Sequence, residues 1–160
     1  MRQADMLLDA LASTPADVAR AAGRTDDPTG RARPAGGEWS VTDILNHLVD
    51  VEERYRARLR TVAEQERPVL APIAPDETRH DPHATCQQLA ARFCTARAET
   101  LAFLRALPRG GWARMAVHQS LTQTRMVRLV RDLVEHDVAH LAQLVDTRSK
   151  ATAARTGDAV

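Results

Sequence analysis

The chain has 160 residues, of which 44% are hydrophobic and only 3% aromatic, and its formal net charge is +1. This composition indicates one globular domain with an aliphatic core, and it favours helix packing over a sandwich of strands. The charge is nearly balanced and no basic block occurs, so the chain lacks the electrostatic signature of a nucleic-acid-binding protein.

The first predicted helix covers residues 4–22, where apolar residues recur every three or four positions. Pro15 lies in phase with this pattern, so we expect one kinked helix, with a second helix capped by Thr14 as the alternative. Residues 23–38 are rich in Gly, Pro and Asp, show no periodicity, and are predicted to form a loop.

The second predicted helix has the clearest start in the chain. Ser40 is placed to cap it and Asp43 follows three residues later, while Trp39 and Ile44 have the spacing of a hydrophobic staple. Pro68 ends this helix, whose apolar stripe comprises Ile44, Leu48, Val51, Tyr55, Leu59 and Val62. The opposite face is predicted to be solvated, and it comprises Glu52, Glu53, Arg56 and Arg60. Along it, Glu52 and Glu53 can each pair with Arg56.

The second half of the chain predicts two more helices. Residues 67–82 hold four prolines and indicate a long ordered crossover, after which Asp81 is expected to cap a helix running from Pro82 or His83 to Leu107. A loop over residues 112–121 precedes a helix over residues 122–146, and residues 148–160 are expected to be a disordered tail. The predicted fold is an all-α four-helix bundle over residues 1–147, with the Pro-rich crossover between its second and third helices.

The sequence also predicts where the protein is located and whether its two cysteines form a disulfide. The N-terminal segment carries acids and no stretch has the length of a membrane span, so we expect a soluble, cytoplasmic protein that contacts no membrane. Cys86 and Cys94 would lie about 12 Å apart along a helix axis, too far for a disulfide. Of the 22 basic residues only Lys150 is a lysine, and the scattered arginines are interpreted as codon bias.

Three histidines interrupt the aliphatic stripes. His136 and His140 are four residues apart and project from one face of the last helix, and His47 lies at the edge of the stripe on the second helix. If these helices pack side by side, the three rings converge. A buried unpaired polar group costs about 1–3 kcal/mol, and one divalent ion would take three imidazole lone pairs at once. The sequence therefore predicts a metal site at His47, His136 and His140.

Neighbouring polar residues are candidates to orient these rings, namely Asp43, Asp50, Asp137 and Gln143. The competing interpretation is that each histidine is a core residue bonded to a carbonyl group. The zincin pattern requires Glu after the first histidine, whereas Asp137 follows His136, so a metalloprotease is not predicted. His80 and His83 are expected to be solvated, Trp39 to act as a staple residue and Trp112 to anchor a loop.

Two segments resemble the DinB-like superfamily of bacterial metal-binding bundles. They are residues 37–55, which include Trp39-Ser40 and His47-Leu48, and residues 135–144, which include His136, His140 and Gln143. The resemblance implies a four-helix bundle that is often dimeric, with His47, His136 and His140 as ligands of a divalent ion such as zinc or nickel. The loop from His118 to Thr122 departs from the family's His-Pro-x-x-Gly-x-x-Thr form, so the role of His118 and the shape of the site mouth stay open.

The resemblance also implies a function, because some members use the metal to activate a low-molecular-weight thiol such as bacillithiol or mycothiol. The first hypothesis is therefore a metal-dependent enzyme, a thiol S-transferase or a hydrolase, whose partners are a small thiol and a small-molecule electrophile, and which forms a homodimer. Asp50 and Glu53 are considered as general bases, but solvated or ligand-orienting roles are preferred for both. The alternative is a non-catalytic metal-binding module with a stress-response or structural role. An open pocket beside the histidines would favour the enzyme.

Overall fold

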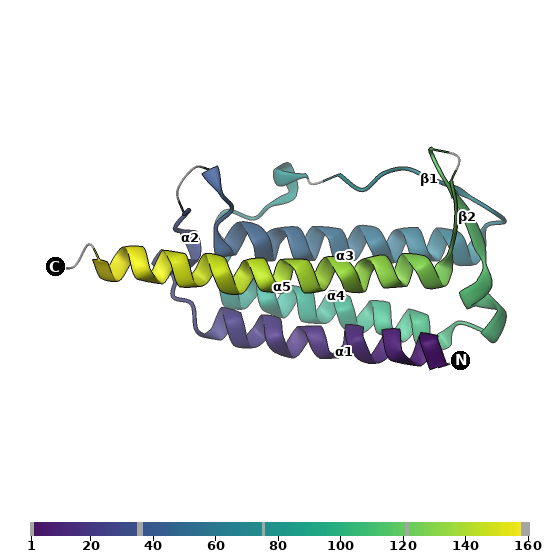
Figure 1. The fold of residues 1–160 in the computed structure, drawn as a ribbon, viewed down its shortest axis with the longest axis horizontal. Helices are drawn as coiled ribbons and strands as arrows, with labels where there is room; N and C mark the ends of the chain where they lie inside the picture. Colours follow the sequence, from purple (N-terminus) through teal and green to yellow (C-terminus); the bar gives the residue numbers. More distant parts are fainter. Residues whose placement is uncertain (1, 35–36, 75, 121, 158–160) are drawn as a thin grey trace.

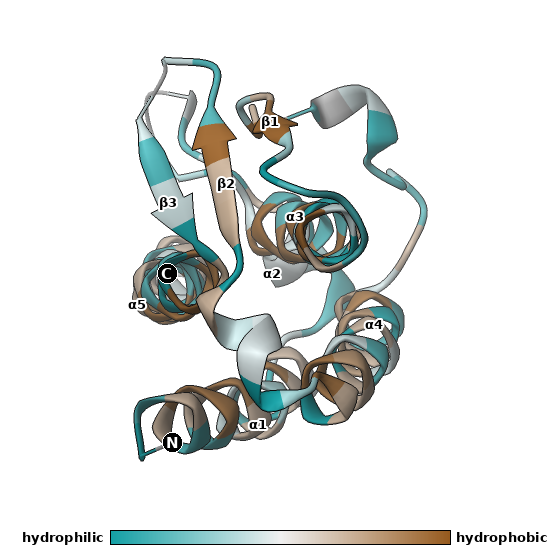
Figure 2. Cartoon of the chain, turned by 90° about the vertical axis from the view of Figure 1, so that its right-hand side faces the viewer, coloured by the Kyte–Doolittle hydropathy of each residue, from teal (hydrophilic) through white to brown (hydrophobic). Residues whose placement is uncertain are grey.

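Four long helices form the body of the protein, in a computed structural model that describes residues 2–34, 37–74, 76–120 and 122–157. They are α1 (Arg2–Gly23), α3 (Val41–Glu64), α4 (Cys86–Ala106) and α5 (Met126–Gly157) (Figure 1). Both α1 and α3 pack against α4 and α5, so α1 lies diagonally opposite α3 and α4 diagonally opposite α5 (Figure 2). The predicted all-α four-helix bundle is confirmed. None of the helices in these described segments is long and apolar enough to cross a membrane.

A long connection allows α3 and α4 to run in the same direction. Residues 65–74 and 76–85 carry the chain back along the outside of the bundle (Figure 1), through β1 (Val69–Leu70) and the 3-10 helix η2 (Glu77–Arg79). At the end of the bundle, β1 pairs in parallel with β2 (Met115–His118), which pairs antiparallel with β3 (Gln123–Arg125). A second 3-10 helix, η3 (Arg109–Ala113), precedes this sheet.

The prediction of a loop over residues 112–121 is therefore wrong, although Leu121 itself lies outside the described residues. The strand β2 pairs with β1, whose residues lie 48 positions earlier in the chain, so neither strand leaves a local pattern that marks it. Such short strands are held by ladder hydrogen bonds rather than by an apolar face, as in the bond from Val117 N to Pro68 O.

Pro15 lies inside α1, which continues through it as one helix, as predicted. Proline has no N–H group, so the carbonyl group of Leu11, four residues earlier, lacks its usual helical donor. In the structure, Leu11 O instead accepts a hydrogen bond from Arg97 Nη1 of α4 at 3.1 Å. The proline thus opens a place on α1 where a buried arginine can bind.

The predicted loop over residues 23–38 contains a short helix, α2 (Asp27–Arg31), which the sequence analysis missed. Asp26 caps it by accepting a hydrogen bond from Thr29 N at 2.8 Å. The helix packs closely, because a Cβ atom on Gly30 would lie only 2.6 Å from Cys86 Sγ at the start of α4. Its single turn is too short for periodicity to reveal it.

The helix ends differ in how well they were predicted. At α3 the predicted cap is confirmed, since Ser40 and Asp43 form a reciprocal capping box. At α4 the predicted start is wrong, because Thr85 and Gln88 form the capping box while Asp81 accepts hydrogen bonds from a turn before the helix. Helix α5 continues to Gly157 instead of ending near Asp146, because the alanine-rich tail favours helix and Ala151 is buried. Residues 158–160 lie outside the described part.

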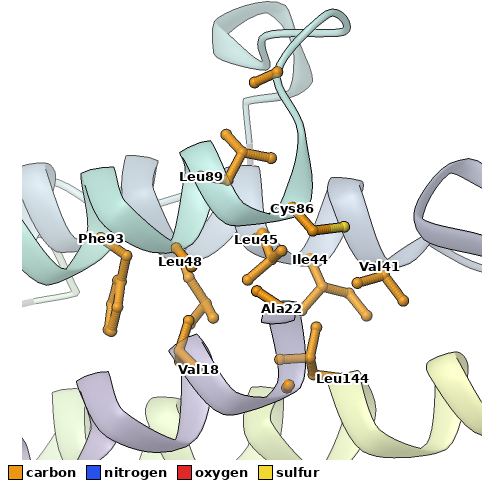
Figure 3. Packing of buried hydrophobic residues seen from close by; sticks show 13 residues of the cluster. Val18, Ala22, Val41, Ile44, Leu45, Leu48, Cys86, Leu89, Phe93 and Leu144 are labelled. Atoms are coloured by element: carbon orange, nitrogen blue, oxygen red, sulfur yellow. The ribbon is translucent and has the colours of Figure 1, made fainter. Parts of the chain in front are cut away.

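The core consists of two apolar clusters separated by a polar layer. The first cluster includes Val18, Ile44, Leu48, Phe93 and Leu144 (Figure 3), and the second, nearer the sheet, includes Leu11, Leu59, Leu104, Met126 and Leu133. Between them lie buried polar side chains from all four long helices: Thr14, His47, Glu52, Arg97 and Asp137. The prediction that Glu52 is solvated and pairs with Arg56 is wrong, because Glu52 is 1% exposed and pairs with Arg97.

Candidate metal centre

Three imidazole rings meet at one side of the polar layer. His47 comes from α3 and is 5% exposed, whereas His136 and His140 lie one turn apart on α5 and are partly exposed. Their ring centroids are 4.3 to 5.1 Å apart. One nitrogen of each ring can be chosen so that all three lie within 4.8 Å of one another. The structure thus brings together the three residues that the sequence analysis singled out.

The hydrogen bonds indicate which nitrogen of each ring faces the shared point. The Nε2 atoms of His47 and His136 are 3.0 Å apart. His140 uses Nδ1 to bond Gln143 Oε1 at 2.8 Å, which leaves its Nε2 free, and the Nδ1 of His136 points towards Asp137 Oδ1 at 3.9 Å. Gln143 and Asp137 therefore lie behind their rings, as groups that orient metal-bound histidines usually do.

The electrostatics of the site favour neutral rings. Burial, together with the neighbouring His140 and His136 rings, lowers the pKa of His47 to about 3. Burial and the His136 ring also lower the pKa of His140, although its bond to Gln143 acts in the opposite direction. Both rings therefore carry free lone pairs at neutral pH, which is the form that binds a metal ion.

This donor set fits a divalent ion. Nitrogen ligands at about 2.0–2.1 Å from a tetrahedral ion lie about 3.3 Å apart, and the closest pair of nitrogens here is already at 3.0 Å. Most of the buried side-chain atoms that lack a hydrogen-bond partner among the described residues lie in the triad or near it, and those of the triad are Nδ1 atoms, on the side of each ring away from the shared point. Apart from Thr124 Oγ1, they are His47 Nδ1 and His136 Nδ1 in the triad, His80 Nε2 beside Trp39, and Asp50 Oδ2, one turn after His47 on α3.

Two aromatic residues at the site were not recognised from the sequence. The Trp39 ring is stacked on His140 at 6.2 Å and lies 4.9 Å from His47, and His80 packs edge-on against Trp39 at 6.5 Å. His80 is partly buried, so the prediction that it is solvated is wrong, whereas His83 is exposed as predicted. His80 comes from the crossover, which has no periodicity that could have placed it near α3.

Ion pairs hold the crossover over this side of α3. Asp50, one turn after His47, pairs with Arg54 and with Arg79 of η2 at 3.0 and 2.8 Å, and Arg54 also reaches Asp76. Arg79 also pairs with Glu53, so neither acid that was considered as a general base is free. Asp50 thus fixes the segment that carries His80. Asp43, by contrast, serves the α3 cap and pairs with Arg33.

A surface cavity of about 560 Å³ lies beside His140, the triad residue that lines it. Its lining includes Trp39, His140 and Gln143, together with the charged residues Glu38, Asp146 and Lys150. Its volume is in the range of small-molecule sites. His118 lies in β2, within the sheet that closes one end of the bundle, and forms no part of the triad.

Comparison with known proteins gives one family and several similar folds. Residues 8–144 match the DinB superfamily. YfiT from Bacillus subtilis, described as a probable metal-dependent hydrolase with an unusual four-helix bundle topology, is 18% identical with a TM-score of 0.80, over 94% of this chain and 88% of that chain. None of the curated proteins matches the sequence.

Two further solved structures share the fold. YjoA, a DinB-like protein from Bacillus subtilis, is 15% identical with a TM-score of 0.65, over 91% of each chain. A variant of a mycothiol-dependent maleylpyruvate isomerase is 10% identical with a TM-score of 0.70, over 88% of this chain and 60% of that chain. At these identities the structural likeness shows the fold, while the family match covers most of the sequence. The chain belongs to the DinB superfamily.

Proposed function

We propose that the protein binds one divalent metal ion through Nε2 of His47, His136 and His140, and that it is a metal-dependent enzyme acting on a small molecule. The observation that carries this proposal is the convergence of three imidazoles within 4.8 Å, one of which, His140, lines an open cavity. Three histidine ligands leave coordination positions free, which is characteristic of catalytic sites rather than closed structural ones.

The ion would act as a Lewis acid that lowers the pKa of a water molecule or thiol, giving a nucleophile near neutral pH. The chain's own residues have separate tasks. Gln143 holds the His140 ring through Nδ1, and Trp39 covers His47 and His140 on the cavity side. The cavity supplies room for a substrate beside the ligands. Zinc and nickel are the ions that we expect.

The reaction is proposed to be hydrolysis or transfer of a small thiol to an electrophile. Two fold neighbours support these types, since YfiT is described as a probable hydrolase and another neighbour depends on mycothiol. The open cavity favours an enzyme over a structural metal-binding module, because a structural site would be closed by protein.

Elemental analysis of the purified protein, followed by titration of the metal-free protein with zinc, nickel and manganese, tests the metal site. We expect one ion per chain and loss of binding in His47→Ala. The matched control is His83→Ala, which removes an exposed histidine outside the site. Equal binding by the wild-type protein and His47→Ala would overturn the assignment of the ligands.

The activity is tested on the loaded protein with two sets of substrates: small thiols with an electrophile such as a haloarene, and activated esters or amides. Turnover that depends on the metal and disappears in His140→Ala supports the enzyme. Tight metal binding without turnover in either set would favour the non-catalytic module.

A further inference from the structure

The polar layer contains a buried ion cluster that the proposed chemistry does not use. It consists of Glu52 of α3, Arg97 of α4 and Asp137 of α5, and is called the Arg97 cluster below. The three side chains are 0 to 2% exposed. Arg97 binds Glu52 through Nε and Nη2 at 3.0 and 2.7 Å, and Asp137 through Nη1 and Nη2 at 2.7 and 3.1 Å.

All five N–H groups of Arg97 are used, because its remaining Nη1 hydrogen goes to Leu11 O, the carbonyl that Pro15 leaves without a helical donor. Thr14 of α1 donates a further bond to Asp137 Oδ2 at 3.2 Å. The guanidinium group also lies over the Phe93 ring at 4.9 Å. Arg97 is therefore fixed in one position by contacts from all four long helices.

The charges of the cluster do not cancel. Two carboxylates face one guanidinium group, so the cluster carries a net charge of −1 in the core. The other buried carboxylate among the described residues, Asp50, is paired with two arginines. An uncompensated charge in the interior is costly, because the low dielectric constant weakens its solvation. A bound dication at the adjacent triad would offset this excess.

Asp137 links the cluster to the triad. It follows His136 in α5, and its Oδ1 atom faces the ring's Nδ1, an otherwise unpartnered buried atom, at 3.9 Å. A ring shift of about 1 Å would bring the two atoms within hydrogen-bond range. The Nε2 of the same ring faces His47. The order carboxylate, imidazole, metal position is the arrangement by which proteins orient histidine ligands.

A purely structural role for the Arg97 cluster would not require its surplus negative charge. Buried ion pairs can often be replaced by apolar residues without loss of stability, so linking four helices is not by itself a reason for two acids around one arginine. What apolar side chains could not supply is a negative potential beside the triad and an acceptor behind His136.

From this geometry we infer that the Arg97 cluster is part of the metal centre: Asp137 positions His136 through its Nδ1–H, and the surplus negative charge that Glu52 adds strengthens the binding of a dication. This inference rests on the proposed metal site. It assigns Glu52 and Asp137 as positioning and charge-supplying residues that do not touch the ion.

The first test compares Glu52→Gln with Glu99→Gln by calorimetric titration of the metal-free proteins with zinc. Both changes remove one carboxylate that pairs with an arginine, but Glu99 is 57% exposed and pairs with Arg56 on the surface. We expect the zinc dissociation constant to rise about tenfold in Glu52→Gln and to change less than about twofold in Glu99→Gln. Equal affinities in a folded Glu52→Gln and the wild-type protein would overturn the role of Glu52.

The second test addresses Asp137. In Asp137→Asn we expect the zinc dissociation constant to rise about 10–100-fold. A measurement on the wild-type protein covers the case in which Asp137→Asn does not fold. In the zinc-loaded protein, nitrogen NMR should show His136 bound through Nε2, with an Nδ1 proton that exchanges slowly with water. A rapidly exchanging proton, or coordination through Nδ1, would overturn the positioning role.

These outcomes separate the inference from the proposed function. If the wild-type protein binds no metal, both fail. If it binds zinc and the two variants bind equally well, the metal site stands and the Arg97 cluster is only structural.

Discussion

The two apolar clusters and the polar layer between them are built on opposite principles. The clusters are filled by Leu, Val, Ile, Ala and Phe, whose burial supplies non-directional stabilisation. In the layer, charges and imidazoles from the same four helices meet at defined distances, and each needs a particular partner. Burial of apolar surface therefore stabilises the fold mainly in the two clusters, whereas the layer between them buries polar and charged groups in its place.

This contrast appears within single helices. On α3, Ile44 and Leu59 pack into the two clusters, while His47 and Glu52 between them face the layer. Variants in the ends should therefore change stability alone, whereas variants in the layer should also change metal affinity or the response to pH, and breaking its buried ion pairs should cost stability as well. Four changes to the protein or its solution test this division, and they are given in order of decreasing size of effect.

Removing the central charge should have the largest effect on stability. Arg97→Met leaves Glu52 and Asp137 buried without their counter-ion, so we expect the free energy of unfolding to fall by about 3–5 kcal/mol. Denaturant titration of the metal-free protein measures this. Arg20→Met is the control, because Arg20 forms an exposed pair with Asp17 that should contribute less than about 1 kcal/mol. Similar losses in both variants would contradict the assigned importance of the layer.

Truncation in the second apolar cluster should alter stability without altering the site. Leu104 is 1% exposed, so Leu104→Ala should lower the free energy of unfolding by about 2–5 kcal/mol through lost burial and a cavity. The zinc dissociation constant of the folded variant should stay within about twofold of the wild-type value. Val138→Ala, at a 63% exposed position, is the control with a change below about 0.5 kcal/mol. A large change in zinc affinity in Leu104→Ala would show that the two regions are coupled.

Metal binding should stabilise the layer through the triad. With free zinc at one hundred times its dissociation constant, the free energy of unfolding should rise by about 2.7 kcal/mol in the wild-type protein. The increase should disappear in His140→Ala and remain in His83→Ala, whose histidine is exposed and outside the triad. Unfolding curves with and without zinc measure the difference. Full stabilisation of His140→Ala would mean that zinc binds elsewhere.

Acid should weaken the metal-free protein because the folded state keeps His47 and His140 neutral. The pKa of His47 is lowered to about 3 by burial and the neighbouring rings, and that of His140 is also lowered. In the unfolded chain both take up protons below about pH 6.5, so stability is retained above that pH and falls as pH decreases towards 4. Each histidine contributes at most about 1.4 kcal/mol per pH unit.

Denaturant titrations at pH 7, 6 and 5 measure this slope. The His47→Ala/His140→Ala double variant should show a flatter profile over the same range, since both shifted groups are absent. A double variant with the wild-type slope would assign the acid sensitivity to other groups.

The sequence predicted those parts of the protein whose signal is local. Helical periodicity located the four long helices, and the spacing of Ser40 and Asp43 located the cap of α3. The residues of the triad could be chosen because an imidazole on an aliphatic stripe is conspicuous. The three rings converge because the apolar stripes of α3 and α5, which carry them, face the same core.

The features that were missed depend on partners far away in the chain. Glu52 looks solvated until Arg97, 45 residues later, is placed across the core from it. His80 reaches the site from a crossover without periodicity, and β1 and β2 are each defined by the other. Local patterns also misjudged α4, because Asp81-Pro82 and Thr85-Gln88 are both plausible helix starts and the second pair forms the cap.

The diagonal placement of helices has a consequence for how this chain reaches its native state. Because α4 and α5 follow each other in the chain but lie opposite each other, and α3 runs parallel to α4, these neighbours cannot close as simple antiparallel hairpins. Native contacts therefore join distant segments, and contact order is higher than in an up-and-down bundle of the same length. Folding should accordingly be slower than for such bundles. His47 and His136 are separated by 89 positions, so they can approach each other only after these long-range contacts have formed. A metal ion would therefore bind late in folding, to a chain that is already nearly native, and would not nucleate the folding reaction.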